Sequence, residues 1–238
     1  MYGLNSYLYY LLLNLNFDLI YILHKSKQMN IFYLDFETTG LSPYLEDVIE
    51  IGIKKDGTDE SYETFVKPKR MPRGSLYMYV PPFIVNLTGI TDTMIYEQGI
   101  EKAVAAYNMY KYIEKHAEKG KPIYIVSHNG NSFDFIFFRK LIHEYITNKG
   151  LGIKPEIIES IKYIDTLLLG KAFPKHKKFS QKAMCEKYQI INESEHRAIG
   201  DVIALEQLFK NLCIDYATYT KKEEKYYLEN PEKIILFI

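Results

Sequence analysis

The sequence predicts an α/β fold in which a mixed five-stranded sheet, an antiparallel meander followed by parallel strands, is flanked by helices. Three observations predict this class. Three strand-like segments follow one another early in the chain, and two more short apolar segments alternate with helical patterns. The length of 238 residues suits one such domain with a sizeable hydrophobic core.

The meander is predicted from three segments that lie close together in the chain. Residues 30–36 are apolar except at their end, which is typical of a buried strand. Residues 47–54 form the second strand, and Asp56-Gly57 then marks a tight turn. Residues 61–67 alternate polar and apolar side chains, so they complete the meander as its third strand.

The remaining elements follow from helical spacing and from short apolar runs. Apolar residues recur at helical intervals from Ile100 to Ile113, and Gly120 ends that pattern. The predicted helices span 82–87, 100–116, 132–146, 179–188 and 197–212, and the two further strands span 122–127 and 162–164.

The two ends of the chain differ from the domain at 29–213. Residues 1–28 are apolar but are interrupted by polar side chains, whereas a membrane helix needs about 20 predominantly apolar residues. Three interpretations stay open: a membrane anchor, which is not favoured, a helix docked on the domain, or sequence upstream of a true start at Met29. The charged tail at 214–238 ends in an apolar run, which we expect either to dock as a strand or to lie loose.

Bulk charge and cysteine content restrict the function little. Lys+Arg and Asp+Glu are both 30, so the zero net charge argues neither for nor against a nucleic-acid partner. Cys185 and Cys213 lack a CxxC pattern, and with no clear export signal we expect two free thiols in a reducing, intracellular compartment. Two clusters are candidates for phosphate contacts: Lys67, Lys69, Arg70 and Arg73, and Lys171, Lys175, His176, Lys177, Lys178 and Lys182.

Two carboxylates mark the end of the first predicted strand. Asp35 and Glu37 are two residues apart, so both side chains point to the same face. Such pairs also occur on surface strands, but the apolar run at 31–34 makes that interpretation harder to hold. Neighbouring carboxylates repel each other and resist burial, and a hard cation such as Mg²⁺ removes that cost.

Two further carboxylates stand where predicted helices begin. Acidic residues favour helix starts because of the macrodipole, so Asp134 and Asp201 have a purely structural explanation as well. A strand followed by His-Asn-Gly and a helix would nevertheless bring Asp134 to the strand ends, where ligands bind in open α/β sheets. His196 precedes Asp201 by five residues, and a neutral imidazole beside a metal-bound water would accept its proton.

Together, these segments resemble the DnaQ-like exonuclease superfamily of the DEDDh type. The first family motif, Asp-x-Glu-Thr-Thr-Gly-Leu, runs from Asp35 to Leu41 without a gap. The third, His-Arg-Ala-x-x-Asp, runs from His196 to Asp201. The second appears as His128, Asn129, Phe133 and Asp134, with one extra residue in its spacer. Residues 87–91 and Asp165-Thr166 resemble two shorter family segments.

The resemblance implies an RNase H-like fold and stepwise removal of nucleoside monophosphates from a 3′ end. It implies that Asp35, Glu37 and Asp201 hold a first Mg²⁺ or Mn²⁺. Asp35 would bridge to a second ion about 4 Å away, supported by Asp134 mostly through water. His196 would deprotonate the attacking water. Residues expected to meet the 3′-terminal nucleotides are Thr38, Thr39 and Gly40 through their backbone, Leu41 as a wedge between bases, and Asn129.

The resemblance favours DNA as the substrate, because the first motif and residues 87–91 together are similar to proofreading and stand-alone DNA exonucleases. Trimming of RNA 3′ ends is the alternative within the same family. A catalytically silent nucleic-acid-binding module is an alternative of another class, although all five catalytic positions are filled. Whether a polymerase is a partner stays open.

Overall fold

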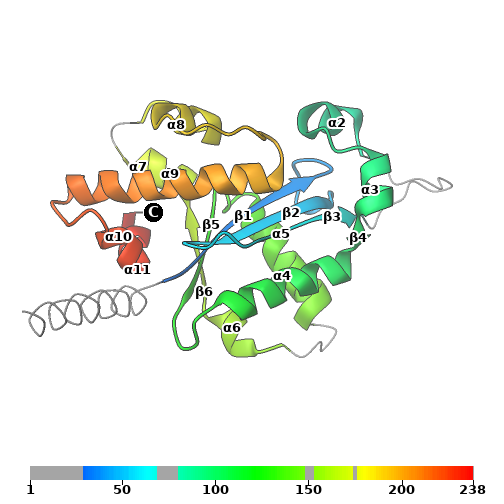
Figure 1. The fold of residues 1–238 in the computed structure, drawn as a ribbon, viewed down its shortest axis with the longest axis horizontal. Helices are drawn as coiled ribbons and strands as arrows, with labels where there is room; N and C mark the ends of the chain where they lie inside the picture. Colours follow the sequence, from blue (N-terminus) through cyan, green and yellow to red (C-terminus); the bar gives the residue numbers. More distant parts are fainter. Residues whose placement is uncertain (1–28, 69–79, 148–152, 174–175, 238) are drawn as a thin grey trace, which may run out of the picture.

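The computed structural model describes residues 29–68, 80–147, 153–173 and 176–237, and its described part contains a six-stranded sheet in the order β4-β3-β2-β1-β5-β6 (Figure 1). The first three strands pair antiparallel as a meander, and β5 and β6 continue parallel to β1. The strands are β1 Asn30–Thr38, β2 Val48–Lys55, β3 Ser61–Lys67, β4 Ile100–Glu101, β5 Ile123–Ser127 and β6 Ile161–Asp165.

The expectation of five strands was wrong by one edge strand. β4 has two residues and pairs parallel with β3 through Val66 and Ile100. Two residues are too few to show the alternation of polar and apolar side chains that marks a strand. Ile100 and Glu101 also fit the helical pattern predicted to begin at residue 100. Only backbone pairing at the edge of the sheet distinguishes it.

Helices cover both faces of the sheet (Figure 1). On one face, α4 Lys102–His116 and α5 Asp134–Leu141 pack against alternate residues of β1 such as Phe32 and Leu34. On the other face, α9 Ala198–Tyr219 packs against the intervening β1 residues, including Tyr33. This alternation between two buried faces explains why β1 reads as a continuous apolar run.

Several helices differ from the sequence prediction. The pattern at 132–146 resolves into α5 followed by a π-helical segment, Ile142–Thr147. The last long helix continues to Tyr219, seven residues beyond the predicted end at Leu212. Of the short helices, α2 Pro82–Thr88 and α8 Gln181–Lys187 were expected, whereas α3 Asp92–Gln98, α6 Pro155–Glu159 and α7 Thr166–Ala172 were missed.

The described part of the tail docks on the domain as helices, so the expectation of a strand or a loose end was wrong. It forms α10 Tyr226–Glu229, α11 Pro231–Ile234 and a 3₁₀ turn. Tyr227 and Ile234 are buried in the core beside Tyr216 of α9. The predicted boundary between the domain (29–213) and the tail (214–238) falls inside α9.

The interpretations of residues 1–28 lie outside the described residues. Within the part that the structure describes, no helix is long and apolar enough to cross a membrane. Cys185 and Cys213 are both buried free thiols, as their spacing predicted.

Candidate active site

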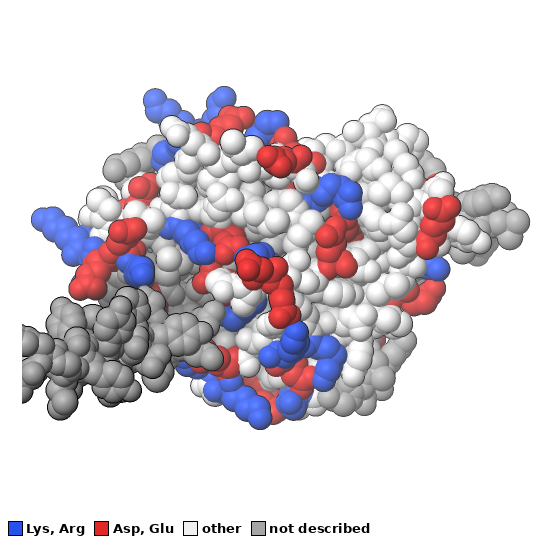
Figure 2. Space-filling model, in the orientation of Figure 1, with Lys and Arg blue, Asp and Glu red and all other residues white. Residues whose placement is uncertain are grey.

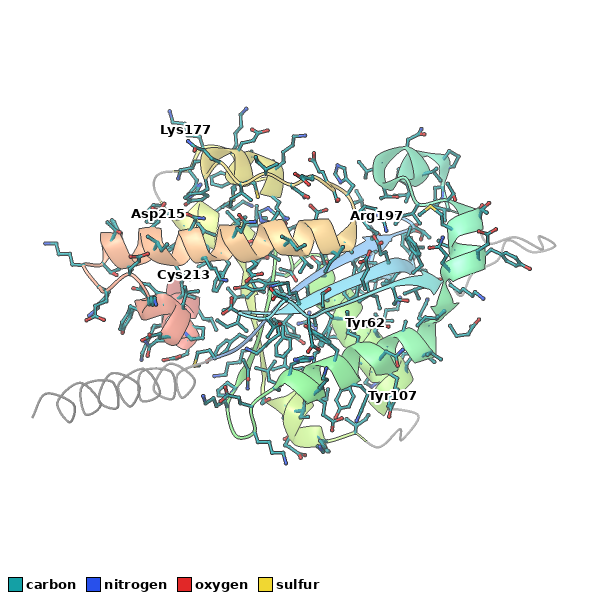
Figure 3. The ribbon with its side chains drawn as sticks, in the orientation of Figure 1. Tyr62, Tyr107, Lys177, Arg197, Cys213 and Asp215 are labelled. Atoms are coloured by element: carbon teal, nitrogen blue, oxygen red, sulfur yellow. The ribbon has the colours of Figure 1, made fainter. Side chains whose placement is uncertain are left out.

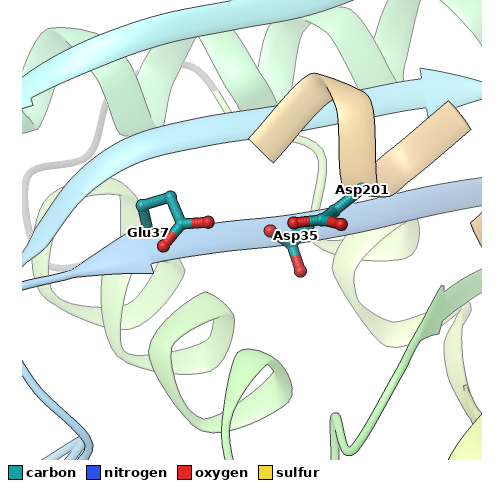
Figure 4. A group of neighbouring side chains, drawn as sticks. All are labelled: Asp35, Glu37 and Asp201. Carbon is teal, nitrogen blue, oxygen red and sulfur yellow. The ribbon is translucent and has the colours of Figure 1, made fainter. Parts of the chain in front are cut away.

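Three carboxylates meet where β1 ends and α9 begins. Asp35 and Glu37 project from the same side of β1, and Asp201 reaches them from the first turn of α9 (Figure 4). One oxygen from each of the three lies within 4.8 Å of the other two. All three side chains are half-buried, so the cluster sits in a partly desolvated recess.

Asp134 joins this cluster from the opposite face of the fold. It is the first residue of α5 and only 2% exposed, and its Oδ1 accepts a hydrogen bond from the backbone N–H of Phe36, 3.2 Å away. Phe36 lies between Asp35 and Glu37, so Asp134 is tied to the strand segment that carries both. The structure therefore brings together the four carboxylates that the sequence singled out.

The pKa of each of these carboxyl groups is raised by burial and by its acidic neighbours. Desolvation and the charge of Asp134 hold the pKa of Asp35 well above its usual range. Desolvation, then Asp201, raises the pKa of Glu37 to about 8. Burial raises the pKa of Asp134 to about 8 and that of Asp201 to about 6. If all four were ionised without a cation, they would carry more negative charge than their surroundings neutralise.

This donor set fits a hard divalent cation. Mg²⁺ and Mn²⁺ prefer carboxylate oxygens, and a cation would offset the repulsion that raises these pKa values. Asp35, Glu37 and Asp201 would hold such an ion directly. The nearby Arg197 lowers the pKa of Glu37, but its guanidinium is hydrogen-bonded to Glu50.

The raised pKa values predict how stability depends on pH without metal. Because Glu37 and Asp134 titrate near pH 8 when folded and near 4 when unfolded, the folded state binds more protons between these values. The free energy of unfolding should therefore fall by several kcal/mol as pH rises through this window, because each group contributes about 1.4 kcal/mol per pH unit. Urea unfolding in EDTA at about pH 5.5 and about pH 8.5 measures it, and Mg²⁺ should restore stability mainly at the higher pH. Equal stability at both values in EDTA would contradict the prediction.

His196 lies in the loop that leads into α9. Its backbone N–H donates to Oδ2 of Asp201 at 3.1 Å, so its position is fixed relative to a carboxylate of the cluster. The side chain is 43% exposed, and its Nε2 lies 3.9 Å from Oε1 of Glu195. Its φ of 63° is uncommon for a residue with a Cβ, and such strain tends to occur at functional sites. The imidazole is thus accessible to solvent beside the carboxylates.

Two residues that the sequence analysis did not single out hold Asp201 in place. Asn192 donates its side-chain amide to Oδ1 of Asp201 at 2.7 Å. Gln181 of α8 donates to the backbone carbonyl of Asp201 at 2.9 Å. Neither has a periodic or motif signal in the sequence, because each acts through contacts made only in the folded state.

His128 of the second motif is a structural residue. Its Nε2 lies 2.8 Å from the backbone carbonyl oxygen of Phe179, and its Nδ1 lies 2.9 Å from Oγ1 of Thr166. Because a carbonyl only accepts hydrogen bonds, Nε2 carries the proton and Nδ1 accepts from the threonine hydroxyl. Burial lowers the pKa of His128, which favours this neutral form. The ring therefore joins the end of β5 to α7 and to the segment before α8.

His128→Ala should destabilise the protein by about 1–3 kcal/mol, because it removes both hydrogen bonds and leaves Thr166 and the Phe179 carbonyl without this partner. Urea unfolding measures this loss. His143→Ala, at an exposed histidine, is the control and should stay within about 0.5 kcal/mol of wild type. Equal stability of the two variants would show that His128 has no bracing role.

Asp165 organises the loop that follows His128. Its two carboxylate oxygens accept from the backbone N–H groups of Asn129, Asn131 and Leu167 at 2.9–3.0 Å. Asn129 has a φ of 61° and an exposed side chain, so it stands at the surface of this loop. Its predicted contact with substrate stays a prediction.

The residues after Glu37 form a tight turn. The Thr38 hydroxyl donates to the Gly40 carbonyl, and the Thr39 hydroxyl donates to Oε2 of Glu46 at 2.6 Å. Both threonines are buried in the turn, so their predicted backbone contact with the 3′-terminal nucleotide stays a prediction. Leu41 is 84% exposed, an exposure compatible with its predicted role as a wedge.

The basic clusters divide in the folded protein. His176 is buried, with its Nε2 3.1 Å from the Tyr188 hydroxyl, whereas Lys177 and Lys178 are exposed. Lys182 pairs with Glu195 at 2.9 Å. Residues 69–79, which hold most of the first cluster, lie outside the described residues. Acidic and basic side chains are interspersed on the face in Figure 2, in keeping with the zero net charge.

Comparison with known proteins places this arrangement in a family. The model of the exonuclease (RNase T) family matches residues 32–209, which include all four carboxylates and His196. The chain belongs to the exonuclease family. This membership confirms the DnaQ-like resemblance that the three motifs predicted.

Related proteins carry the exonuclease domain in different contexts. The chain is 35% identical over 182 residues to a PolC-type DNA polymerase III of Thermotoga petrophila, across 74% of the chain and 11% of that protein. It is 28% identical to exonuclease DPD1 (chloroplastic/mitochondrial) of Arabidopsis thaliana, across 80% of the chain and 58% of that protein. It is 30% identical to the 3′–5′ exonuclease DinG of Staphylococcus haemolyticus, across 86% of the chain and 20% of that protein. The chain thus spans only part of each of these relatives.

Solved structures share the fold. Escherichia coli exonuclease I in complex with a dA16 oligonucleotide superposes with a TM-score of 0.61 at 19% identity, over 79% of this chain and 41% of that one. This likeness confirms the mixed sheet flanked by helices.

Proposed function

We propose that the protein is a metal-dependent 3′–5′ exonuclease that hydrolyses terminal phosphodiester bonds and releases nucleoside monophosphates. The observation that carries the proposal is the convergence of Asp35, Glu37 and Asp201, with one oxygen of each within 4.8 Å of the others. Family membership and relatives named as 3′–5′ exonucleases support the reaction and its direction.

Two Mg²⁺ or Mn²⁺ ions fit the four carboxylates. Asp35, Glu37 and Asp201 would hold the first ion, and Asp35 with Asp134 would hold the second. When bound, such ions polarise the scissile phosphate and stabilise the charge that develops on the attacking and leaving oxygens.

Side chains of this chain perform the remaining tasks. His196 accepts the proton of the attacking water, which requires a neutral imidazole at physiological pH. The backbone of Thr38 to Gly40 holds the 3′-terminal nucleotide. Leu41 inserts between the last two bases, and Asn129 contacts the strand.

We favour a DNA 3′ end as the substrate. PolC-type relatives are named as DNA polymerases, and the exonuclease I structure contains a deoxyadenosine oligonucleotide. Leu41 and Tyr44 are exposed in the segment between β1 and β2, and such side chains suit stacking against unpaired bases, which tolerates many sequences. A polymerase partner is compatible with the PolC relatives.

The test uses the full chain with 3′- and 5′-labelled single-stranded DNA and RNA of matched sequence, in Mg²⁺, Mn²⁺ or EDTA. We expect metal-dependent shortening from the 3′ end, faster on DNA. Faster shortening of RNA would instead support the 3′-trimming exoribonuclease. Binding without cleavage in any metal would support a silent nucleic-acid-binding module.

A further inference from the structure

One charged residue stands out in the apolar strand β2. Glu50 is fully buried, between Ile49 and Ile51, which are also fully buried. A buried carboxylate is costly unless it is paired and hydrogen-bonded, so its partners indicate why the fold tolerates it.

The partners of Glu50 are the two residues where α9 starts. Arg197 donates from Nε and Nη2 to Oε1 of Glu50 at 3.1 and 2.7 Å, and Nε also reaches Oε2 at 3.3 Å. The backbone N–H of Ala198 donates to Oε2 at 2.9 Å. The guanidinium carbon of Arg197 lies 5.1 Å from the centre of the Phe65 ring on β3. Figure 3 shows Arg197 at the sheet-facing start of α9.

A glycine on the same strand brings the helix into direct contact with the sheet. Gly52 follows Glu50 by two residues, so both face α9, and a Cβ at Gly52 would lie 2.6 Å from the carbonyl carbon of Ala198. In the β1–β2 register, Glu50 pairs with Glu37 and Gly52 pairs with Asp35. The two β2 residues that contact the start of α9, Glu50 and Gly52, are therefore paired with the two carboxylate residues on β1.

The segment held in this way carries two functional groups. Arg197 follows His196 directly, and its carbonyl accepts the first-turn hydrogen bond from the Asp201 N–H at 3.0 Å. The His196 N–H in turn donates to the Asp201 side chain. Displacement of Arg197 would therefore move both His196 and Asp201.

We propose that Glu50 and Arg197 act as positioning residues, a clamp that sets the place of Asp201 and His196 over the Asp35–Glu37 pair. This inference rests on the proposed nuclease function for its kinetic part only. The two-pronged Arg–carboxylate geometry fixes direction as well as distance, which a lysine could not reproduce.

The chain contains a matched control for this clamp. Lys54 of β2 and Glu206 of α9 form another ion pair between the same two elements, 2.5 Å apart and with side chains only 14% and 12% exposed. This pair lies further along both elements, away from the carboxylates. Its loss should weaken the attachment of α9 without displacing the first turn.

The experiment compares Glu50→Gln, Arg197→Lys and Lys54→Met in the full chain. The Kd of Mn²⁺ is measured by titration calorimetry, and kcat and KM are measured on 3′-labelled DNA. Urea unfolding measures stability. Arg197→Lys is the decisive variant because it keeps the charges of both residues and removes only the two-pronged guanidinium contact. If Glu50 acted on the metal through its charge alone, the Kd of Mn²⁺ for Arg197→Lys would equal that of wild type.

We expect Glu50→Gln and Arg197→Lys each to raise the Kd of Mn²⁺ about tenfold and to lower kcat about tenfold, with KM within about twofold of wild type. Lys54→Met should lower the free energy of unfolding and leave the Kd of Mn²⁺, kcat and KM unchanged. The clamp is overturned if Arg197→Lys binds Mn²⁺ and turns over like wild type, or if Lys54→Met raises the Kd equally. If Glu50→Gln fails to fold, Arg197→Lys alone decides. A wild type that binds Mn²⁺ but cleaves nothing would defeat the proposed function, while the Kd comparison would still decide the clamp.

Discussion

Asp35→Asn should abolish metal-dependent cleavage and at the same time stabilise the metal-free protein. Asp35 clusters with Glu37 and Asp201 and is the proposed bridging ligand. Its loss should therefore remove several kcal/mol of transition-state stabilisation, about a thousandfold or more in kcat. The pKa of the Asp35 carboxyl is raised by burial and by Asp134, Asp201 and Glu37. In the metal-free fold this carboxyl must therefore either hold a proton or repel its neighbours, and an asparagine avoids both costs.

A cleavage assay in Mg²⁺ measures the first effect. Urea unfolding in EDTA at about pH 8 measures the second, because the cost of burying these carboxyl groups is larger there than at lower pH. Asp59→Asn, at an exposed aspartate in the turn after β2, is the matched control and should change neither quantity appreciably. If Asp35→Asn lost activity but was destabilised in EDTA, the loss would reflect disrupted folding. If it retained activity, the assignment of Asp35 as a ligand would be wrong.

His196→Ala should lower kcat about 10²- to 10⁴-fold, the usual contribution of a general base. The metal affinity should change little, because Asp201 keeps its hydrogen bond from the backbone N–H of residue 196 after this substitution. The alanine stays in a backbone conformation with φ near 63°, so a modest loss of stability is also expected.

Single-turnover kinetics on 3′-labelled DNA and titration with Mn²⁺ separate these effects. His143→Ala provides the histidine control at an exposed position outside the site. A variant that cleaves at the wild-type rate would remove His196 from the mechanism. A variant with much weaker Mn²⁺ binding would mean that the imidazole acts on the metal site rather than on the water.

Much of the site was predictable because it depends on local rules. Alternation along a strand places Asp35 and Glu37 on one face whatever the rest of the fold does. Asp134 and Asp201 stand at helix starts that the apolar patterns after them indicate. The match of the motifs to a known family then connected these local facts, and the structure brings all four carboxylates together.

Other features depend on contacts between distant segments, and such contacts leave no repeating pattern of polar and apolar residues in the sequence. β4 is defined by pairing with β3, and the tail becomes helical where Tyr227 and Ile234 reach the core. The motif histidine His128 gave no sign of whether it would act in chemistry or in bracing until Phe179 and Thr166 were found beside it. Glu50, a charge between apolar residues of β2, was a signal of this kind in the sequence that the sequence analysis did not use.

The family, the candidate metal ligands and the strand face of Asp35 and Glu37 follow from the sequence, because side-chain direction and motif spacing are properties of short segments. How closely Asp201 approaches Asp35 and Glu37 is visible only in the folded protein, because that distance depends on how α9 packs on β2. Glu50 and Gly52 of β2, about 150 residues earlier in the chain, contact the start of α9 through Arg197 and Ala198.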